Sequence, residues 1–180
     1  MKYSLFRFIS LAGVLLTLVA SVFTPLVPIT GGVRIALESG TVASRRSLPI
    51  RIWDPGKFSF EVVQQPSDDP GYVSYKEDKV TQFRLASDYG SKGFLAHNDM
   101  AGASFFSANL DDIISVKYSD GSSETYQVVQ IRRLQAVSPL SPYSRFLDLD
   151  NDNASLSAVD LFYQTYGVKD TLVWQTCIAN

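Results

Sequence analysis

The run Thr171–Cys177, with the sequence TLVWQTC, most constrains what this chain can fold into. Its valine, threonines and tryptophan favour extended backbone, and seven residues are enough for a strand. Successive side chains of a strand point to opposite faces. One face therefore carries Leu172, Trp174 and Thr176, and the other carries Val173, Gln175 and Cys177. The run predicts a strand with a packed aromatic face that presents the only cysteine near its end.

A second β-type run, Gly93–Asn98, carries the only histidine, His97. A thiolate is a nucleophile and an imidazole is an acid or base near neutral pH, so the pair is the smallest set for nucleophilic catalysis. Both residues have ordinary structural roles as well. A single cysteine is often a small buried apolar residue, and a single histidine is often a hydrogen-bonded structural group.

Composition narrows the class of protein. A chain of 180 residues is long enough for one domain with a hydrophobic core. The formal net charge is −2 without a block of like charges, which argues against a nucleic-acid surface or a polybasic membrane patch. Aromatic residues make up 12% of the chain, which favours a packed β-rich core. One cysteine excludes an intramolecular disulfide and a multi-cysteine metal site.

The N-terminus has the pattern of an export signal. Lys2 and Arg7 precede the uncharged apolar run Phe8–Phe23. We expect residues 1–29 to be a signal peptide or a helical signal-anchor; Val19-Ala20-Ser21 offers small residues for cleavage. Residues 30–47 are then a linker or stalk. Residues 48–180 form the domain, which faces the outside of the cell if the basic end stays in the cytoplasm.

Periodicity and turn residues predict a mainly β domain with two short helices. Strands are expected at 48–53, 58–63, 112–118, 124–134 and 171–177, with Asp120-Gly121 as a hairpin turn. One short helix is expected at 101–106, capped by Asn98 or Asp99, and a second at 156–166, ending at Gly167.

These runs are similar to a known family, the sortases. TLVWQTC resembles their Thr-Leu-x-Thr-Cys strand, FLAHND resembles their Ala-His-Asn segment, and Tyr126-Gln127-Val128 resembles part of their hairpin. The resemblance covers residues 50–180 and implies a closed or nearly closed sortase-like β-barrel. It implies a bacterial, extracytoplasmic cysteine transpeptidase or peptidase, anchored in the cell membrane or secreted. Its substrates are exported proteins with a short sorting motif, and the acceptor is water or an amine on the cell wall or another protein.

The resemblance also assigns roles to residues. Cys177 is the nucleophile and forms a thioester, His97 is the acid for the leaving amine, and Thr176 and Asn98 support them. Tyr72, Tyr75 and Phe83 are candidate groove residues, with core packing as the alternative. The family's oxyanion arginine lies on a strand after the cysteine, whereas this sequence stops at Asn180, so we expect a truncated chain or an unusual relative. Internal candidates for that arginine are Arg84, Arg132, Arg133 and Arg145, of which Arg132 and Arg133 are favoured by alternation.

Other functions stay open. An exported β-barrel that has lost activity and binds a peptide or an envelope partner is the main alternative. A wall enzyme of the L,D-transpeptidase type fits less well, because Gln175-Thr176-Cys177 lacks its Ser-x-Gly-Cys context. A zinc hydrolase needs carboxylate ligands beyond one His and one Cys.

We expect no cofactor. Asp148, Asp150 and Asp152 alternate like the first ligands of a calcium loop, but the loop pattern then fails at Asn153 and Val159, where Gly and Glu are required. A polar loop that caps the next helix is the alternative.

Overall fold

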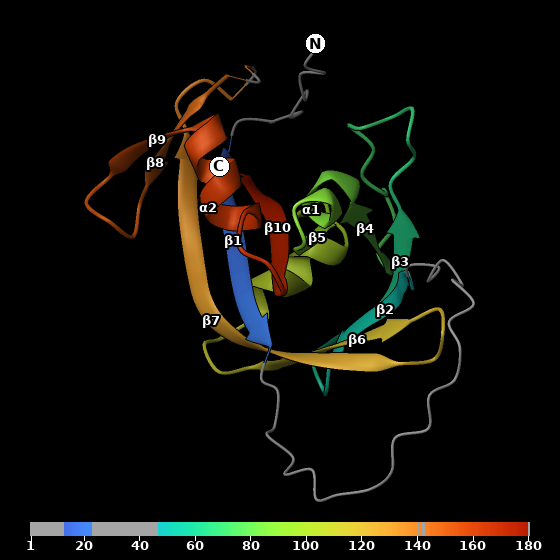
Figure 1. The fold of residues 1–180 in the computed structure, drawn as a ribbon. Helices are drawn as coiled ribbons and strands as arrows, with labels where there is room; N and C mark the ends of the chain where they lie inside the picture. Colours follow the sequence, from blue (N-terminus) through green and yellow to red (C-terminus); the bar gives the residue numbers. More distant parts are fainter. Residues whose placement is uncertain (1–12, 23–46, 140, 142, 180) are drawn as a thin grey trace, which may run out of the picture.

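The computed structural model describes residues 13–22, 47–139, 141 and 143–179 of the chain. The described part is mainly β, with one ten-stranded sheet, two α-helices and one 3-10 helix (Figure 1). This confirms the β-rich class that periodicity predicts.

The strands match the predicted runs closely where a run alternates or ends in a turn residue. Gly121, at the tip of the predicted hairpin, has a φ of 89° that favours glycine. The strands are β1 (Gly13–Val22), β2 (Pro49–Asp54), β3 (Phe58–Gln64), β4 (Lys79–Phe83), β5 (Lys92–Leu95), β6 (Ile113–Tyr118), β7 (Ser123–Ala136), β8 (Arg145–Asp148), β9 (Ala154–Ser157) and β10 (Thr171–Ala179).

The helices are α1 (Arg84–Asp88), the 3-10 helix η1 (Ala101–Ser107) and α2 (Ala158–Tyr166). The predicted cap of η1 is wrong: its N-cap is Met100, without a side-chain hydrogen bond, and Asp99 accepts from the Tyr75 hydroxyl instead. α2 begins later than predicted, because residues 154–157 pair as β9. The Ser157 side chain caps it by accepting from the N–H of Asp160.

Hydrogen-bonded neighbours in the sheet follow the order β1-β10-β5-β4-β3-β2-β6-β7-β8-β9, and β1 also pairs with β7. The pairs β10–β5 and β3–β4 are parallel, and all others are antiparallel. The parallel pair β10–β5 matters most for function, because it joins the cysteine run to the histidine run.

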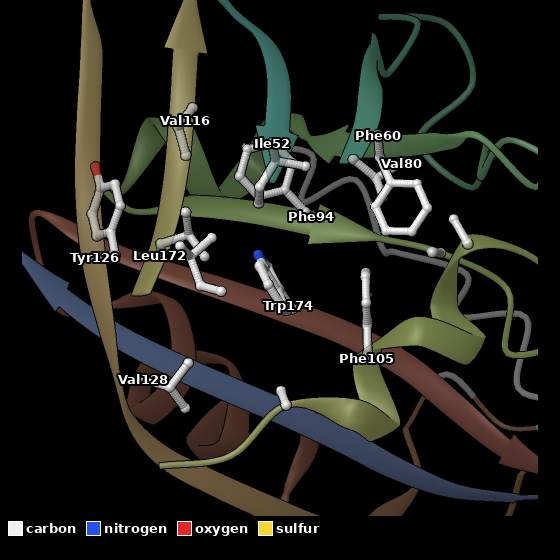
Figure 2. Close-up of a cluster of buried hydrophobic side chains, with 14 of the residues drawn as sticks. Ile52, Phe60, Val80, Phe94, Phe105, Val116, Tyr126, Val128, Leu172 and Trp174 are labelled. Atoms are coloured by element: carbon white, nitrogen blue, oxygen red, sulfur yellow. The ribbon is translucent and has the colours of Figure 1, made fainter. Parts of the chain in front are cut away.

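The core confirms the predicted faces of β10. Leu172 and Trp174, each 1% exposed, lie in the main hydrophobic cluster, at whose centre Phe105 stacks on the Trp174 indole with ring centroids 5.1 Å apart (Figure 2). Val173 faces the other way, into a smaller cluster with Phe83 and Tyr166. Burying each large apolar side chain contributes about 1.5–3 kcal/mol, so both faces of β10 hold the strand in place.

The prediction of an N-terminal apolar helix is wrong for residues 13–22. These residues form β1, which is hydrogen-bonded to β10 along one edge and to β7 along the other. Its β-branched residues, among them Val14, Thr17 and Val19, favour extended backbone. Within the described ranges, no helix is long and apolar enough to cross a membrane. Residues 1–12 and 23–46, and with them most of the predicted signal and stalk, lie outside the described part.

Candidate functional site

The parallel pairing of β5 and β10 brings His97 and Cys177 together. Leu95 and Gln175 are partners in the register, and His97 and Cys177 each lie two residues further along in the same direction. Contact between the two segments continues past that pair, because the N–H of Ala96 donates to the Gln175 carbonyl at 3.2 Å. Neighbouring strands are about 4.8 Å apart. The only histidine and the only cysteine therefore lie at the same end of two adjacent strands.

Burial places both side chains on the same face. On the histidine segment Phe94 and Ala96 are buried, whereas Leu95 and His97 are half-buried. On β10, Trp174 and Thr176 are buried, whereas Gln175 and Cys177 are half-buried. Side chains in register on neighbouring strands project to the same side. His97 and Cys177 thus share the face that leads away from the main core.

Thr176 and Gly102 fix the backbone of this pair. The Thr176 hydroxyl, in a residue 2% exposed, donates to the Ala96 carbonyl at 2.9 Å. The His97 carbonyl accepts from the N–H groups of Met100 at 3.1 Å and Gly102 at 3.0 Å. A Cβ on Gly102 would lie 2.3 Å from the Thr176 hydroxyl oxygen, so the start of η1 approaches β10 as only glycine allows. The sequence gives no signal that marks Gly102 among the other small residues of its segment.

Tyr75 joins the site from the segment between β3 and β4. Its ring centroid lies 5.0 Å from that of His97, and its hydroxyl donates to Asp99 Oδ2 at 2.6 Å. Tyr75 is 63% exposed, so core packing is not its role. Phe83, by contrast, is 2% exposed and is a core residue, whereas Tyr72 and Asn98 are half-buried.

The environment of Cys177 disfavours its charged form. Burial raises the pKa of the Cys177 thiol above its ordinary value. The residue is a free cysteine. Because the thiolate is the nucleophile, only a small fraction of this side chain is reactive at neutral pH.

The arginines predicted as oxyanion candidates are engaged elsewhere. Arg132 forms an ion pair with Asp148 at 2.7 Å, with both side chains nearly buried, and Arg133 pairs with Asp150 at 2.6 Å. Thr17 of β1 pairs with Gln175 on one edge and Arg132 on the other, which places Arg132 two strands from β10, roughly 10 Å away.

The other two candidate arginines also lie away from the pair. Arg145 donates to Ser155 in the β8–β9 hairpin, and Arg84 is exposed at the start of α1. These positions do not assign the binding of a substrate oxyanion to any of the four arginines.

The three alternating aspartates lie in and beside the turn between β8 and β9. Asp148 and Asp150 each bind an arginine, and Asp152 and Asn153 have positive φ angles of 47° and 55°. Among the residues that the structure describes, no group of three or more His, Cys, Asp or Glu side chains could hold a metal ion.

No protein-family model, curated protein or solved structure matches this chain. The candidate site therefore rests on the chain's own geometry. That geometry brings His97, Cys177 and Thr176 together and adds Tyr75, Asp99 and Gly102.

Proposed function

We propose that this chain is a cysteine transpeptidase or peptidase of the sortase type that acts on a short motif in exported proteins. One observation carries the proposal: the only histidine and the only cysteine each lie two residues beyond Leu95 and Gln175, the last register pair of the parallel strands β5 and β10. Because neighbouring strands are about 4.8 Å apart, side chains at these two positions on the same face can reach each other. The motif likeness around the two residues supports the same reading.

The chemistry requires two acyl transfers. The Cys177 sulfur attacks the carbonyl carbon of a substrate amide and forms a C–S bond. The C–N bond then breaks, and His97 protonates the leaving amine. A second amine or water attacks the thioester and gives its proton to His97, and the C–S bond breaks to release the Cys177 thiolate, which restores the starting pair. No metal or cofactor is required in either step.

The raised pKa of the thiol sets the protonation state in which the pair works. Most molecules then hold a neutral thiol, and the reactive form is the minority that holds a thiolate. Arg132 or Arg133 would have to leave its aspartate before it could bind a substrate oxyanion.

The proposal extends to location and fold. An extracytoplasmic domain, anchored or secreted through the N-terminal segment, would meet exported substrates and amine acceptors on the cell wall or on other proteins. A sortase-like barrel is the proposed finer description of the sheet; it is supported by the strand order around β5, β10 and β4 and by the double pairing of β1.

A second candidate is an inactive module that binds a peptide or an envelope partner. It is favoured by the ion pairs of Arg132 and Arg133 and by the raised pKa of Cys177. In such a module, His97 takes no part in any reaction of Cys177.

The test uses the single thiol of the chain. Cys177 is labelled with a peptidyl chloromethyl ketone and, separately, with iodoacetamide, in the wild type and in His97→Gln. A working pair predicts that His97→Gln slows the peptidyl probe about 100-fold, because the thiolate first adds to the ketone carbon and His97 protonates the oxygen that results, before chloride leaves. Iodoacetamide should be slowed much less, because direct displacement of iodide needs only the thiolate. Cys177→Ser controls for labelling elsewhere. Equal effects on both reagents, or no effect, would favour the binding module.

A further inference from the structure

The segment between β3 and β4 presents Tyr75 to the site in a defined position. The buried Gln65 side chain donates to the carbonyls of Pro70 at 3.0 Å and Tyr72 at 3.2 Å, and its oxygen accepts from the N–H of Arg84 at 3.1 Å. The N–H of Ser74, next to Tyr75, donates to the Thr81 hydroxyl at 2.8 Å. The backbone is thus held before Tyr75 by a side chain at the end of β3 and beside it by a side chain of β4.

The Tyr75 side chain makes two contacts on the histidine segment. The ring lies against the His97 imidazole, with an angle of 59° between the ring planes. The hydroxyl donates to Asp99 Oδ2, two residues after His97 in the chain. An aromatic residue that is 63% exposed gains little from burial, so these two contacts, and not packing, hold it here. The hydrogen bond to Asp99 raises the pKa of Tyr75, and a tyrosine hydroxyl is protonated, and so a donor, at neutral pH even without that shift.

The orientation of the His97 imidazole depends on a contact such as the one with Tyr75. Its backbone is fixed through its carbonyl, but the imidazole is half-buried at a strand end, where side chains have several rotamers. A proton donor 1 Å out of place loses much of its effect. The Tyr75 ring occupies the space beside the imidazole, with the ring centroids 5.0 Å apart, and so limits these rotamers.

We propose that Tyr75 is a positioning residue that holds the His97 imidazole toward Cys177, with its ring against the imidazole and its hydroxyl tied to Asp99. Its role in catalysis rests on the proposed function. The contact between Tyr75 and His97 does not depend on the proposed function. The segment between β3 and β4 is then a wall of the site and not a passive connection.

The experiment reads the imidazole directly, because the chain has one histidine and therefore one set of imidazole proton resonances. In Tyr75→Leu, loss of the ring current moves these resonances toward the position of a solvent-exposed histidine. In Tyr75→Phe the ring remains, so most of the shift is retained. Tyr143→Leu is the matched control, because Tyr143 is also highly exposed, at 67%, on the connection between β7 and β8.

The same variants are then tested with the peptidyl chloromethyl ketone and iodoacetamide. Loss of orientation in Tyr75→Leu lowers the rate of peptidyl labelling about tenfold, with a smaller loss in Tyr75→Phe and none in Tyr143→Leu. Iodoacetamide labelling stays close to the wild-type rate in all three variants.

Two results would overturn the proposal: imidazole resonances that do not move in Tyr75→Leu, or resonances that move while the peptidyl rate stays at the wild-type value. If wild-type labelling itself proves independent of His97, the proposed function fails, and the resonance shift alone decides whether Tyr75 holds the imidazole.

Discussion

Gly102→Ala adds one methyl group at the point where η1, β10 and the histidine segment meet. An ideal Cβ there lies 2.3 Å from the Thr176 hydroxyl oxygen and 2.6 Å and 2.9 Å from the carbonyl oxygen and carbon of His97. Ordinary contacts are 3.4 Å or longer. Two of the three close atoms belong to backbone, so neither a side-chain rotation nor a small shift of one atom relieves the clash.

We expect Gly102→Ala to lower the free energy of unfolding by about 1–3 kcal/mol, the usual cost of overpacking a core. With a urea m-value of about 1–3 kcal/mol/M, the midpoint of unfolding falls by roughly 1 M. The clash pushes Thr176 and His97 apart. We therefore expect Gly102→Ala to lose the extra rate of peptidyl labelling that depends on His97, even at urea concentrations where the variant is still folded.

The matched control is Gly121→Ala in the turn between β6 and β7. An alanine there meets no atom within 4 Å but must adopt a φ of 89°, which costs on the order of 1 kcal/mol. It destabilises the chain without touching the site, so its labelling stays dependent on His97. A Gly102→Ala variant with wild-type stability and wild-type labelling would refute the packing of η1 against Thr176 and His97.

Three further outcomes follow from the same structure. Burial raises the pKa of the Cys177 thiol, so the rate of iodoacetamide labelling should rise with pH to a midpoint above that of a free cysteine peptide measured under the same conditions. A midpoint at or below that of the peptide contradicts this. Leu15 of β1 is the register partner of Cys177, so Leu15→Cys should form a disulfide with Cys177 under mild oxidation. Leu16→Cys, whose register partner is Thr176, should not. No disulfide in either variant would mean that the apolar N-terminal segment is not paired with β10 in solution. Asp148→Ala leaves Arg132 nearly buried without its ion-pair partner and should lower the free energy of unfolding, measured in urea, by about 3–5 kcal/mol. Asp150→Ala removes the partner of Arg133, whose side chain is 58% exposed, and should lower it by less than about 1 kcal/mol. Equal losses in the two variants would contradict the burial of the first pair.

The strands and the two faces of β10 could be predicted because alternation is a local signal. Leu172, Trp174 and Val173 lie on the faces that their positions in the run predict, and the hairpin turns at Gly121 as its turn residues indicate. The same local logic failed at η1. Asn98 and Asp99 are good caps in isolation, but Asp99 bonds to a tyrosine from another segment, and no local pattern reports that competition.

The site could be predicted only in part. The two reactive residue types are visible in the sequence, but their juxtaposition depends on the parallel pairing of β5 with β10, a long-range contact. Tyr75, which the resemblance names as a candidate groove residue, lies beside His97, and Gly102 lies beside Thr176, through further long-range contacts that no local pattern reports. The prediction of a helix at residues 13–22 failed for a different reason. An uncharged apolar run rich in β-branched residues fits a membrane helix and an inner strand equally well by composition, and the available strand edges of β7 and β10 decide between them.

The most direct test of the central claim is disulfide trapping between positions 97 and 177. His97→Cys is oxidised mildly in the folded, full-length chain, and the free thiols are counted by alkylation and mass spectrometry, with Ser122→Cys in the exposed turn between β6 and β7 as the control. Adjacent parallel strands hold in-register residues within the range that a disulfide spans. The account predicts rapid, reducible loss of both thiols in His97→Cys and none in Ser122→Cys. Two free thiols in His97→Cys after oxidation would contradict the juxtaposition of His97 and Cys177.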